Sequence, residues 1–201
     1  TKAGADRILT VDLHAGQIQG FFDIPVDHLY SIKVLSGYFV RNKVENLCIV
    51  SPDVGGIKMA RAYSNLLKAP LAIVDKRRES DKHTKVMNII GDVKGFNVVI
   101  VDDLISTGGS MVEAANALKA SGAHDIYACV VHPVLAGPAI ERIRSSSIKT
   151  IIVSDTIPLP QDKKIDKIKV LSVSSILAEA IKRIHMHESV STLFADANVE
   201  A

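Results

Sequence analysis

The segment NVVIVDDLISTGGSMVEAANALKASG, residues 97–122, holds the densest group of residues that could perform chemistry. A β-branched run ends in two carboxylates, Asp102 and Asp103, and a short loop then leads into a segment with helical periodicity. Glycines let a backbone approach an anion closely, and the N–H groups at the start of a helix point toward it. The loop therefore indicates a phosphate cradle made by Ser106, Thr107, Gly108, Gly109 and Ser110.

The two carboxylates beside this cradle would repel a phosphate, so they need another partner. Carboxylates accept hydrogen bonds from sugar hydroxyl groups, directly or through a divalent cation. Asp102 and Asp103 are therefore candidates for contact with the sugar of a phosphorylated ligand. The alternative is a strand that ends in solvated Asp residues and a helix capped by Ser or Thr. The segment is neither a Walker A loop nor a GxGxxG loop.

Short β-branched segments alternate with segments of helical period along the whole chain. The predicted strands are 7–13, 46–50, 71–74, 97–101, 125–131, 149–153 and 167–173. The predicted helices are 28–42, 56–68, 109–121, 138–145 and 174–187. This alternation predicts an α/β fold with a mostly parallel sheet that helices cover on both faces.

Charged residues follow several of these strands directly. Ligands of parallel sheets bind beyond the carboxyl ends of the strands, so these residues are candidates for one site. His14 follows the first strand, Asp53 the second, and a basic run after Asp75 the third.

The composition narrows the class of protein. The 201 residues are 47% hydrophobic but only 4% aromatic, which predicts a large core of Ile, Val, Leu and Ala. Lys and Arg (24) nearly balance Asp and Glu (22), which argues against nucleic-acid binding. The apolar runs are strand-sized, which argues against a membrane span. Cys48 and Cys129 lie in such runs and are expected to be reduced, buried thiols of a cytoplasmic protein.

The segment 97–122 resembles the phosphoribosyl-diphosphate loop shared by type I phosphoribosyltransferases and ribose-phosphate diphosphokinases. The resemblance implies that Ser106 to Ser110 hold the 5-phosphate of ribose 5-phosphate. It also implies that Asp102 and Asp103 lie near the 2- and 3-hydroxyl groups. Many members carry Asp where this chain has Ser106, and a serine hydroxyl can still donate to phosphate.

The segment VDLHAGQIQGFFDIPVDHLY, residues 11–30, is similar to a signature of the diphosphokinases that the transferases lack. This similarity implies that His14 binds Mg²⁺ near the phosphates of ATP, and that Asp53 contacts a second metal ion or the sugar. Because Mg²⁺ prefers oxygen ligands, an outer-sphere contact or a hydrogen bond to phosphate is an alternative for His14.

Two further segments resemble the same family. VDKRRESDKHTKV, residues 74–86, resembles its flexible catalytic loop. This implies that Lys76 and Arg78 neutralise the charge of the transferred diphosphoryl group, with Arg78 also touching ribose 5-phosphate. ESVSTLF, residues 188–194, resembles the family's ending, where serines matching Ser189 and Ser191 belong to a regulatory phosphate and nucleotide site. The alternative is a tail that docks on the first part of the chain.

The resemblance implies a type I phosphoribosyltransferase-like domain at residues 33–185. Residues 1–32 would be the remnant of a second, similar N-terminal domain, with the tail 186–201 packing back on it. The expected protein is a cytoplasmic homo-oligomer, a hexamer or dimer, that uses Mg²⁺, ATP and ribose 5-phosphate. The chain is expected to be truncated at its N-terminus, lacking part of the ATP site, so inactivity of this chain alone is one expectation.

The expected reaction transfers the β,γ-diphosphoryl group of ATP to the 1-hydroxyl of ribose 5-phosphate and releases AMP. One alternative is a type I phosphoribosyltransferase, which needs no ATP. A second is a non-catalytic regulatory homologue, which is expected to have lost catalytic residues that this chain retains.

Overall fold

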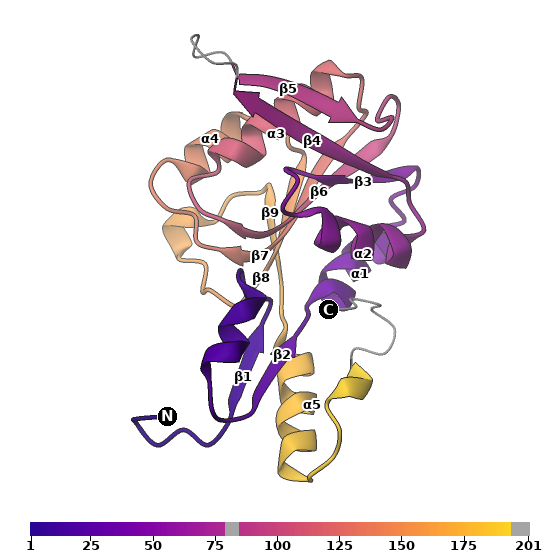
Figure 1. Ribbon diagram of the computed structural model, residues 1–201. Helices are drawn as coiled ribbons and strands as arrows, with labels where there is room; N and C mark the ends of the chain where they lie inside the picture. The colour runs from indigo at the N-terminus through magenta and orange to yellow at the C-terminus, as the bar shows by residue number, and fades with distance from the viewer. Residues whose placement is uncertain (79–84, 194–201) are drawn as a thin grey trace.

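The computed structural model describes residues 1–78 and 85–193, and the side chains of residues 1–75 and 87–193. Two sheets are present in these ranges, a small one of two strands and a large one of seven (Figure 1). The small sheet pairs β1 (Ile8–Val11) with β2 (Val26–Leu29). The strands of the large sheet are β3 (Leu47–Ser51), β4 (Leu71–Arg78), β5 (Lys85–Ile90), β6 (Asn97–Ile105), β7 (Ile126–Pro133), β8 (Thr150–Ser154) and β9 (Ile168–Leu171).

The large sheet has the strand order β5-β4-β3-β6-β7-β8-β9. All neighbouring strands are parallel except β4 and β5, which are antiparallel. These pairings confirm the predicted α/β fold with a mainly parallel sheet. The chain passes from β3 outward to β4 and later returns to β6 on the other side of β3. The winding direction therefore reverses between β3 and β6, which is where open parallel sheets bind their ligands.

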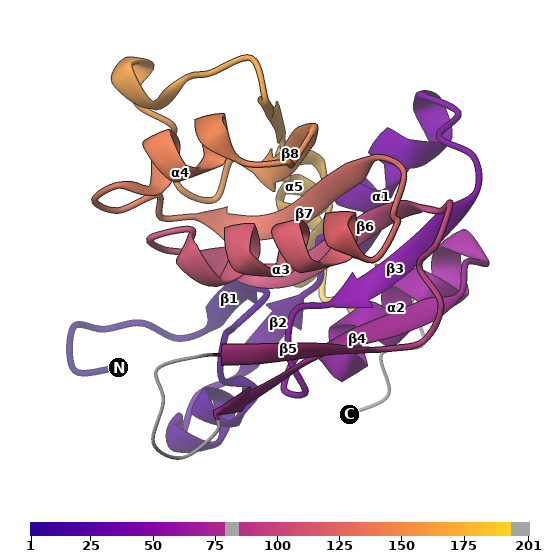
Figure 2. The ribbon, with the colours of Figure 1, turned by 90° about the horizontal axis from the view of Figure 1, so that it is seen from above.

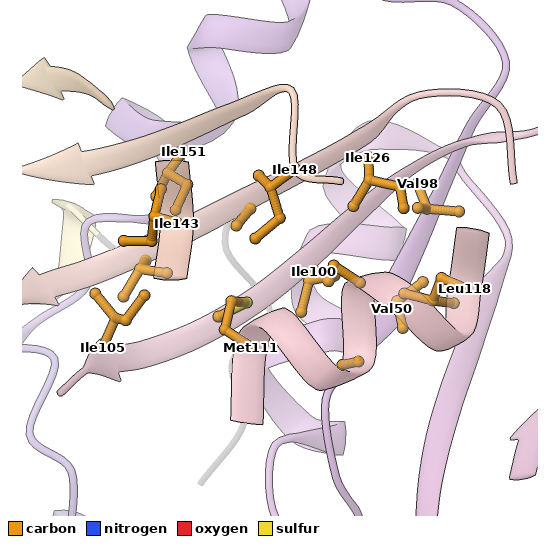
Figure 3. Close-up of a cluster of buried hydrophobic side chains, with 14 of the residues drawn as sticks. Val50, Val98, Ile100, Ile105, Met111, Leu118, Ile126, Ile143, Ile148 and Ile151 are labelled. Atoms are coloured by element: carbon orange, nitrogen blue, oxygen red, sulfur yellow. The ribbon is translucent and has the colours of Figure 1, made fainter. Parts of the chain in front are cut away.

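Helices cover both faces of the large sheet (Figure 2). On one face lie α1 (Ile32–Arg41) and α2 (Ile57–Leu67), and on the other α3 (Gly109–Ala120) and α4 (Ala139–Ser145). Successive side chains of β6 alternate between these layers. Val98 and Ile100 pack with Met111 and Leu118 of α3, as Figure 3 shows, whereas Val99 belongs to the cluster of α1 and α2. Because both faces are buried, the strand is a continuous apolar run.

The helix α5 (Ser174–His185) packs on the small sheet instead of the large one (Figure 1). Leu29 of β2, Ala180 of α5 and Val190 beyond it form a buried apolar cluster, which also includes Leu193. The short 3-10 helices η1 (Gly16–Phe21), η2 (Gln161–Lys163) and η3 (Ser191–Leu193) lie in the connections. Within the described ranges, no helix is both long and apolar enough to cross a membrane.

Among the predicted elements whose ends differ from the structure, two were wrong because of a partner strand. The predicted helix 28–42 starts too early, because Val26–Leu29 pairs with β1 as a strand. The predicted strand 71–74 is too short, because the chain stays extended to Arg78 and pairs with β5, which was not predicted. In both places the partner strand decides the conformation, and a single segment carries little sign of its partner.

Candidate active site

A cavity of about 810 Å³ is lined by residues of both sheets. Its size is typical of small-molecule sites. The small sheet contributes the turn after β1 and residues of β2, while the large sheet contributes the ends of β3 and β6 and the start of α2. Four candidates from the sequence meet here: His14, Asp53, Asp102 and Asp103. These four residues come from three separate segments of the chain. The reversal of winding between β3 and β6 brings Asp53, Asp102 and Asp103 together.

Asp102 and Asp103 lie near the end of β6, which runs further than predicted, to Ile105. Burial raises the pKa of Asp102 to about 7, and the nearby carboxylates of Asp103 and Asp53 contribute. The backbone N–H of Asp103 donates to Asp102 Oδ1 at 3.0 Å. The pocket thus concentrates negative charge that a cation or sugar hydroxyl groups would stabilise.

His14 and Asp103 connect the two sheets. The Nδ1 atom of His14 forms a hydrogen bond with Asp103 Oδ2, which raises the pKa of His14. His14 remains 74% exposed, whereas Asp103 is 16% exposed. The imidazole is therefore oriented by the large sheet while most of its surface is open to a ligand.

Asp53 is held by its own turn after β3. Its Oδ1 accepts the backbone N–H of Gly56 at 3.0 Å, and its carbonyl accepts the hydroxyl of Ser51 at 2.6 Å. These contacts point the carboxyl group across the start of α2, beside Asp102 in the pocket.

The turn that carries His14 depends on Asp12, which is 5% exposed and has a φ of 44°. Its Oδ2 atom accepts the backbone N–H of Ser31 at 2.8 Å and the Ser31 hydroxyl at 2.7 Å. Burial raises the pKa of Asp12, and the two bonds from Ser31 oppose that shift. The carboxyl group thus ties the end of β1 to the segment that follows β2.

Two histidines hold the same turn from other directions. The Nε2 atom of His28 accepts the backbone N–H of Leu13 at 2.9 Å. His132, at the end of β7, donates from Nε2 to the carbonyl of Asp12 at 2.8 Å, because a carbonyl can only accept. Its Nδ1 atom lies 2.8 Å from the Thr156 hydroxyl. His132 therefore anchors the turn to the large sheet.

The predicted phosphate cradle lies between β6 and α3. Gly108 adopts a left-handed φ of 73° directly before α3. A Cβ on Gly108 would lie 3.7 Å from the Cα of Ala139, which shows how closely the loop approaches α4. The side chains of Ser106, Thr107 and Ser110 are exposed. The loop is separate from the residues that line the cavity.

The remaining candidates are not brought into the pocket by the described atoms. Lys76 and Arg78 lie on the backbone of β4, and their side chains are outside the described part of the structure. Ser189 and Ser191 follow α5, and their hydroxyl groups are 2.6 Å apart. Arg183 Nη1 donates to the carbonyl of Ser189 at 3.2 Å. The regulatory role of the two serines stays a prediction.

Sequence reasoning missed Ser31 and His132. His132 ends β7, the neighbour of β6, so the strand-end rule that selected Asp53 and Asp102 also reaches His132 when it is applied to every strand. Ser31 has no comparable signal, because its role depends on where β2 places it.

Magnesium suits the donor chemistry of this pocket. Mg²⁺ takes oxygen ligands and keeps several waters, so one or two carboxylates and a substrate phosphate suffice. Asp53, Asp102 and Asp103 supply such oxygens. Among the residues that the structure describes, no three His, Cys, Asp or Glu side chains form a ready-made cage. The set therefore fits a hydrated ion that arrives with a phosphate ligand.

Comparison with known proteins relates the chain to one family. The family model described as the phosphoribosyl synthetase-associated domain matches residues 78–195. The chain is 54% identical over 192 residues to a ribose-phosphate pyrophosphokinase of Bacillus caldolyticus, covering 96% of this chain and 61% of that relative. It is 56% identical over 195 residues to one of Caldanaerobacter subterraneus, covering 96% of this chain and 62% of that relative.

A solved structure agrees with the sequence relatives. The crystal structure of phosphoribosylpyrophosphate synthetase from Mycobacterium smegmatis matches with a TM-score of 0.86 and 39% identity, over 92% of this chain and 61% of that one. The chain thus spans about 61% of the length of the relatives that it matches. Together with the family model, these matches show that the chain belongs to the phosphoribosyl synthetase-associated domain family.

Proposed function

We propose that this chain is part of a ribose-phosphate diphosphokinase, which transfers the β,γ-diphosphoryl group of ATP to the 1-hydroxyl of ribose 5-phosphate. The observation that carries the proposal is the meeting of His14, Asp53, Asp102 and Asp103 in one cavity. His14 belongs to the segment that distinguishes diphosphokinases from transferases by resemblance. Its hydrogen bond to Asp103 joins that segment to the carboxylates that both branches share.

Binding of ribose 5-phosphate would start at the loop before α3. The N–H groups at the helix start and the exposed hydroxyl groups of Ser106, Thr107 and Ser110 would hold the 5-phosphate, with Gly108 and Gly109 allowing close approach. The carboxylates of Asp102 and Asp103 would accept hydrogen bonds from the ribose hydroxyl groups. This arrangement would place the 1-hydroxyl toward the cavity that His14 and Asp53 line.

In the transfer step, the 1-oxygen of the ribose attacks the β-phosphorus of ATP, and the bond from that phosphorus to the AMP oxygen breaks. Positioning and charge stabilisation carry most of such reactions. Lys76 and Arg78 would neutralise the negative charge that builds on the transferred group, Arg78 also contacting ribose 5-phosphate. Arg can bind two phosphate oxygens at once, whereas Lys supplies a compact charge.

A bound Mg²⁺ would supply charge neutralisation at the ATP phosphates, with Asp53 and His14 as its candidate protein contacts. His14 Nδ1 is engaged by Asp103, so its Nε2 atom is the one that would reach the ion, its water or a phosphate. A hydrogen bond from His14 to a phosphate would also stabilise the negative charge of the phosphate, without a direct bond between His14 and the metal ion.

The proposal extends to assembly and to the division of the chain. A homo-oligomer, hexamer or dimer, in the cytoplasm is the proposed form of the whole protein. The division at residues 1–32 and 33–185 also stays a proposal. The contact of Leu29 with Val190 supports docking of the tail on residues 1–32, while Ala180 brings α5, which this division assigns to the second unit, into the same cluster.

Phosphorus NMR tests the function directly. This chain, and a version extended to the full length of its relatives, would be mixed with ATP, ribose 5-phosphate and Mg²⁺. We expect the extended protein to produce AMP together with a new diphosphate signal on the ribose. Activity of the shorter chain would show that the added segment is dispensable.

The alternatives predict other outcomes of the same experiment. A phosphoribosyltransferase would leave ATP untouched and would consume phosphoribosyl diphosphate when a base is added. A regulatory homologue would bind ligands without turnover even at full length. Either result would overturn the proposed function.

A further inference from the structure

The phosphate loop is held from behind by the segment that leads from β7 into α4. The carbonyl of Ile105 accepts the backbone N–H of Leu135, and the carbonyl of Ser106 accepts that of Ala136, both at 3.0 Å. Two successive peptide groups of the loop are therefore anchored through their carbonyl oxygens to residues 135 and 136.

The next carbonyl of the loop, that of Thr107, is held by a side chain instead of a backbone N–H group. The Nη1 atom of Arg142, in α4, donates to the carbonyl of Thr107 at 3.1 Å. The same nitrogen would lie 3.2 Å from a Cβ on Gly109, so the guanidinium lies directly against the start of α3. The helices α3 and α4 lie side by side on this face of the sheet (Figure 2).

These three bonds fix where the amide groups of the loop point. The loop's peptide bonds are trans. In a planar trans peptide the N–H points opposite to the C=O. The N–H groups of Ser106, Thr107 and Gly108 must therefore point away from the β7–α4 segment. Successive N–H groups that share a direction form an anion-binding concavity.

We propose that Arg142 is a positioning residue of the phosphate site: by holding the Thr107 carbonyl, it directs the Gly108 N–H toward the 5-phosphate of ribose 5-phosphate. This inference rests on the proposed function of the loop. Without Arg142, the Thr107–Gly108 peptide can rotate, because the φ of Gly108 is unrestricted by a side chain. The carbonyl oxygen would then face the phosphate and repel it.

The test compares Arg142→Ala, Arg142→Lys and Arg144→Ala in this chain. Arg144 is exposed on the same helix, so its removal is a matched loss of charge. Calorimetry would measure the affinity for ribose 5-phosphate. We expect Arg142→Ala to weaken this affinity on the order of tenfold, since the loss of a hydrogen bond to a charged group has an effect of about this size. Lys keeps one donor and the charge, so Arg142→Lys should recover most of the affinity, and Arg144→Ala should bind normally.

Amide NMR separates positioning from direct contact and from general destabilisation. Inorganic phosphate should shift the Gly108 amide signal in the parent chain and in Arg142→Lys, but not in Arg142→Ala. An unchanged Gly108 response in Arg142→Ala, with weaker binding, would mean that Arg142 contacts phosphate itself and that the inference is wrong. A melting temperature of the ligand-free Arg142→Ala variant well below that of Arg144→Ala would also overturn it.

The same experiment separates this inference from the proposed function. Normal binding by Arg142→Ala would refute the role of Arg142 and leave the function intact. Failure of the parent chain to bind ribose 5-phosphate would refute the proposed use of the loop, and the role of Arg142 with it.

Discussion

Asp103 and His14 lie against each other in the pocket, but the two sides of the pocket are built differently. Asp103 lies on β6, where the strand is paired with β7 up to Ile105 and is buried from Val98 to Val101. His14 lies in a turn beyond the small sheet, and that turn is held by polar contacts from Ser31, His28 and His132. The first side depends on sheet and core, and the second on a few hydrogen bonds.

This difference indicates how the work of the site is divided. The large-sheet side is built from paired strands and buried core, which would suit the proposed recognition of ribose 5-phosphate. The small-sheet side rests on single hydrogen bonds, which would suit a group that adjusts to ATP in the proposed reaction. Four groups of changes test this division, and the largest expected effect comes first.

Lys76→Ala and Arg78→Ala should lower turnover by about 10²–10³ in the full-length protein, because charge stabilisation in the transition state has this magnitude. Affinity for ribose 5-phosphate should change much less in Lys76→Ala, since the loop before α3 is the proposed phosphate site. It should fall more in Arg78→Ala, which also loses its proposed contact with ribose 5-phosphate. Phosphorus NMR gives the rate and calorimetry the affinity. Lys182→Ala, an exposed lysine of α5, is the control. Equal losses of binding and turnover would break the proposed division.

Gly108→Ala should weaken ribose 5-phosphate binding about tenfold, because it disturbs the loop that is proposed to donate to the charged phosphate. The φ of 73° also disfavours any side chain, at a cost of roughly 1–2 kcal/mol in stability. Gly95→Ala is a matched control, since Gly95 has a φ of 76° and open space around it. Both variants should lose similar stability in urea unfolding, but only Gly108→Ala should lose affinity. A similar affinity loss in both would remove the special role of the loop.

Asp12→Ala should destabilise the protein by about 1–3 kcal/mol, because it leaves the buried N–H and hydroxyl of Ser31 without their acceptor. Asp12→Asn should lose less, since Asn keeps an acceptor oxygen and tolerates the left-handed conformation. Urea unfolding measures the stability. Affinity for ribose 5-phosphate should stay near normal in both variants. A large loss of this affinity would show that the small sheet also shapes the phosphate side.

The smallest effect concerns pH. Burial lowers the pKa of His28, against the opposing charge of Asp12, while Tyr30 and Gln19 lie beside the ring. Because the folded state keeps the ring neutral, its stabilising contribution is complete above the ordinary pKa of about 6.5 and is lost as the pH falls below it. A protonated Nε2 also cannot accept the Leu13 N–H.

His28→Gln tests this pH dependence. Glutamine retains an acceptor oxygen and does not titrate in this range. Between about pH 7.5 and about pH 5, urea unfolding should show a small extra loss of stability in the parent chain, reduced by solvent screening of the partly exposed ring and absent in His28→Gln. An identical pH response in both proteins would exclude His28 as the source.

The same contrast between the two sides explains what the sequence could predict. The strands of the large sheet are visible as apolar runs because both of their faces are buried, as for Val98 to Val101. Their carboxyl ends share one edge, so Asp53, Asp102 and Asp103 could be grouped in advance. The strand β2 could not be predicted, because only Leu29 of VDHL is buried and the strand forms only through its pairing with β1 in the folded protein. The contacts of Ser31 and Arg142 join segments that no local pattern connects, whereas His132 follows the predicted strand 125–131 and could have been selected by its position.

The packing of α5 on β2 has a consequence for the order in which the protein forms. Chains emerge from the ribosome N-terminus first, and units fold as their residues become available. Leu29 emerges early, but Ala180 and Val190, which cover it, are added only after the whole large sheet has been made. The side of the pocket that carries His14 is therefore completed last during synthesis, after every strand of the large sheet has been made.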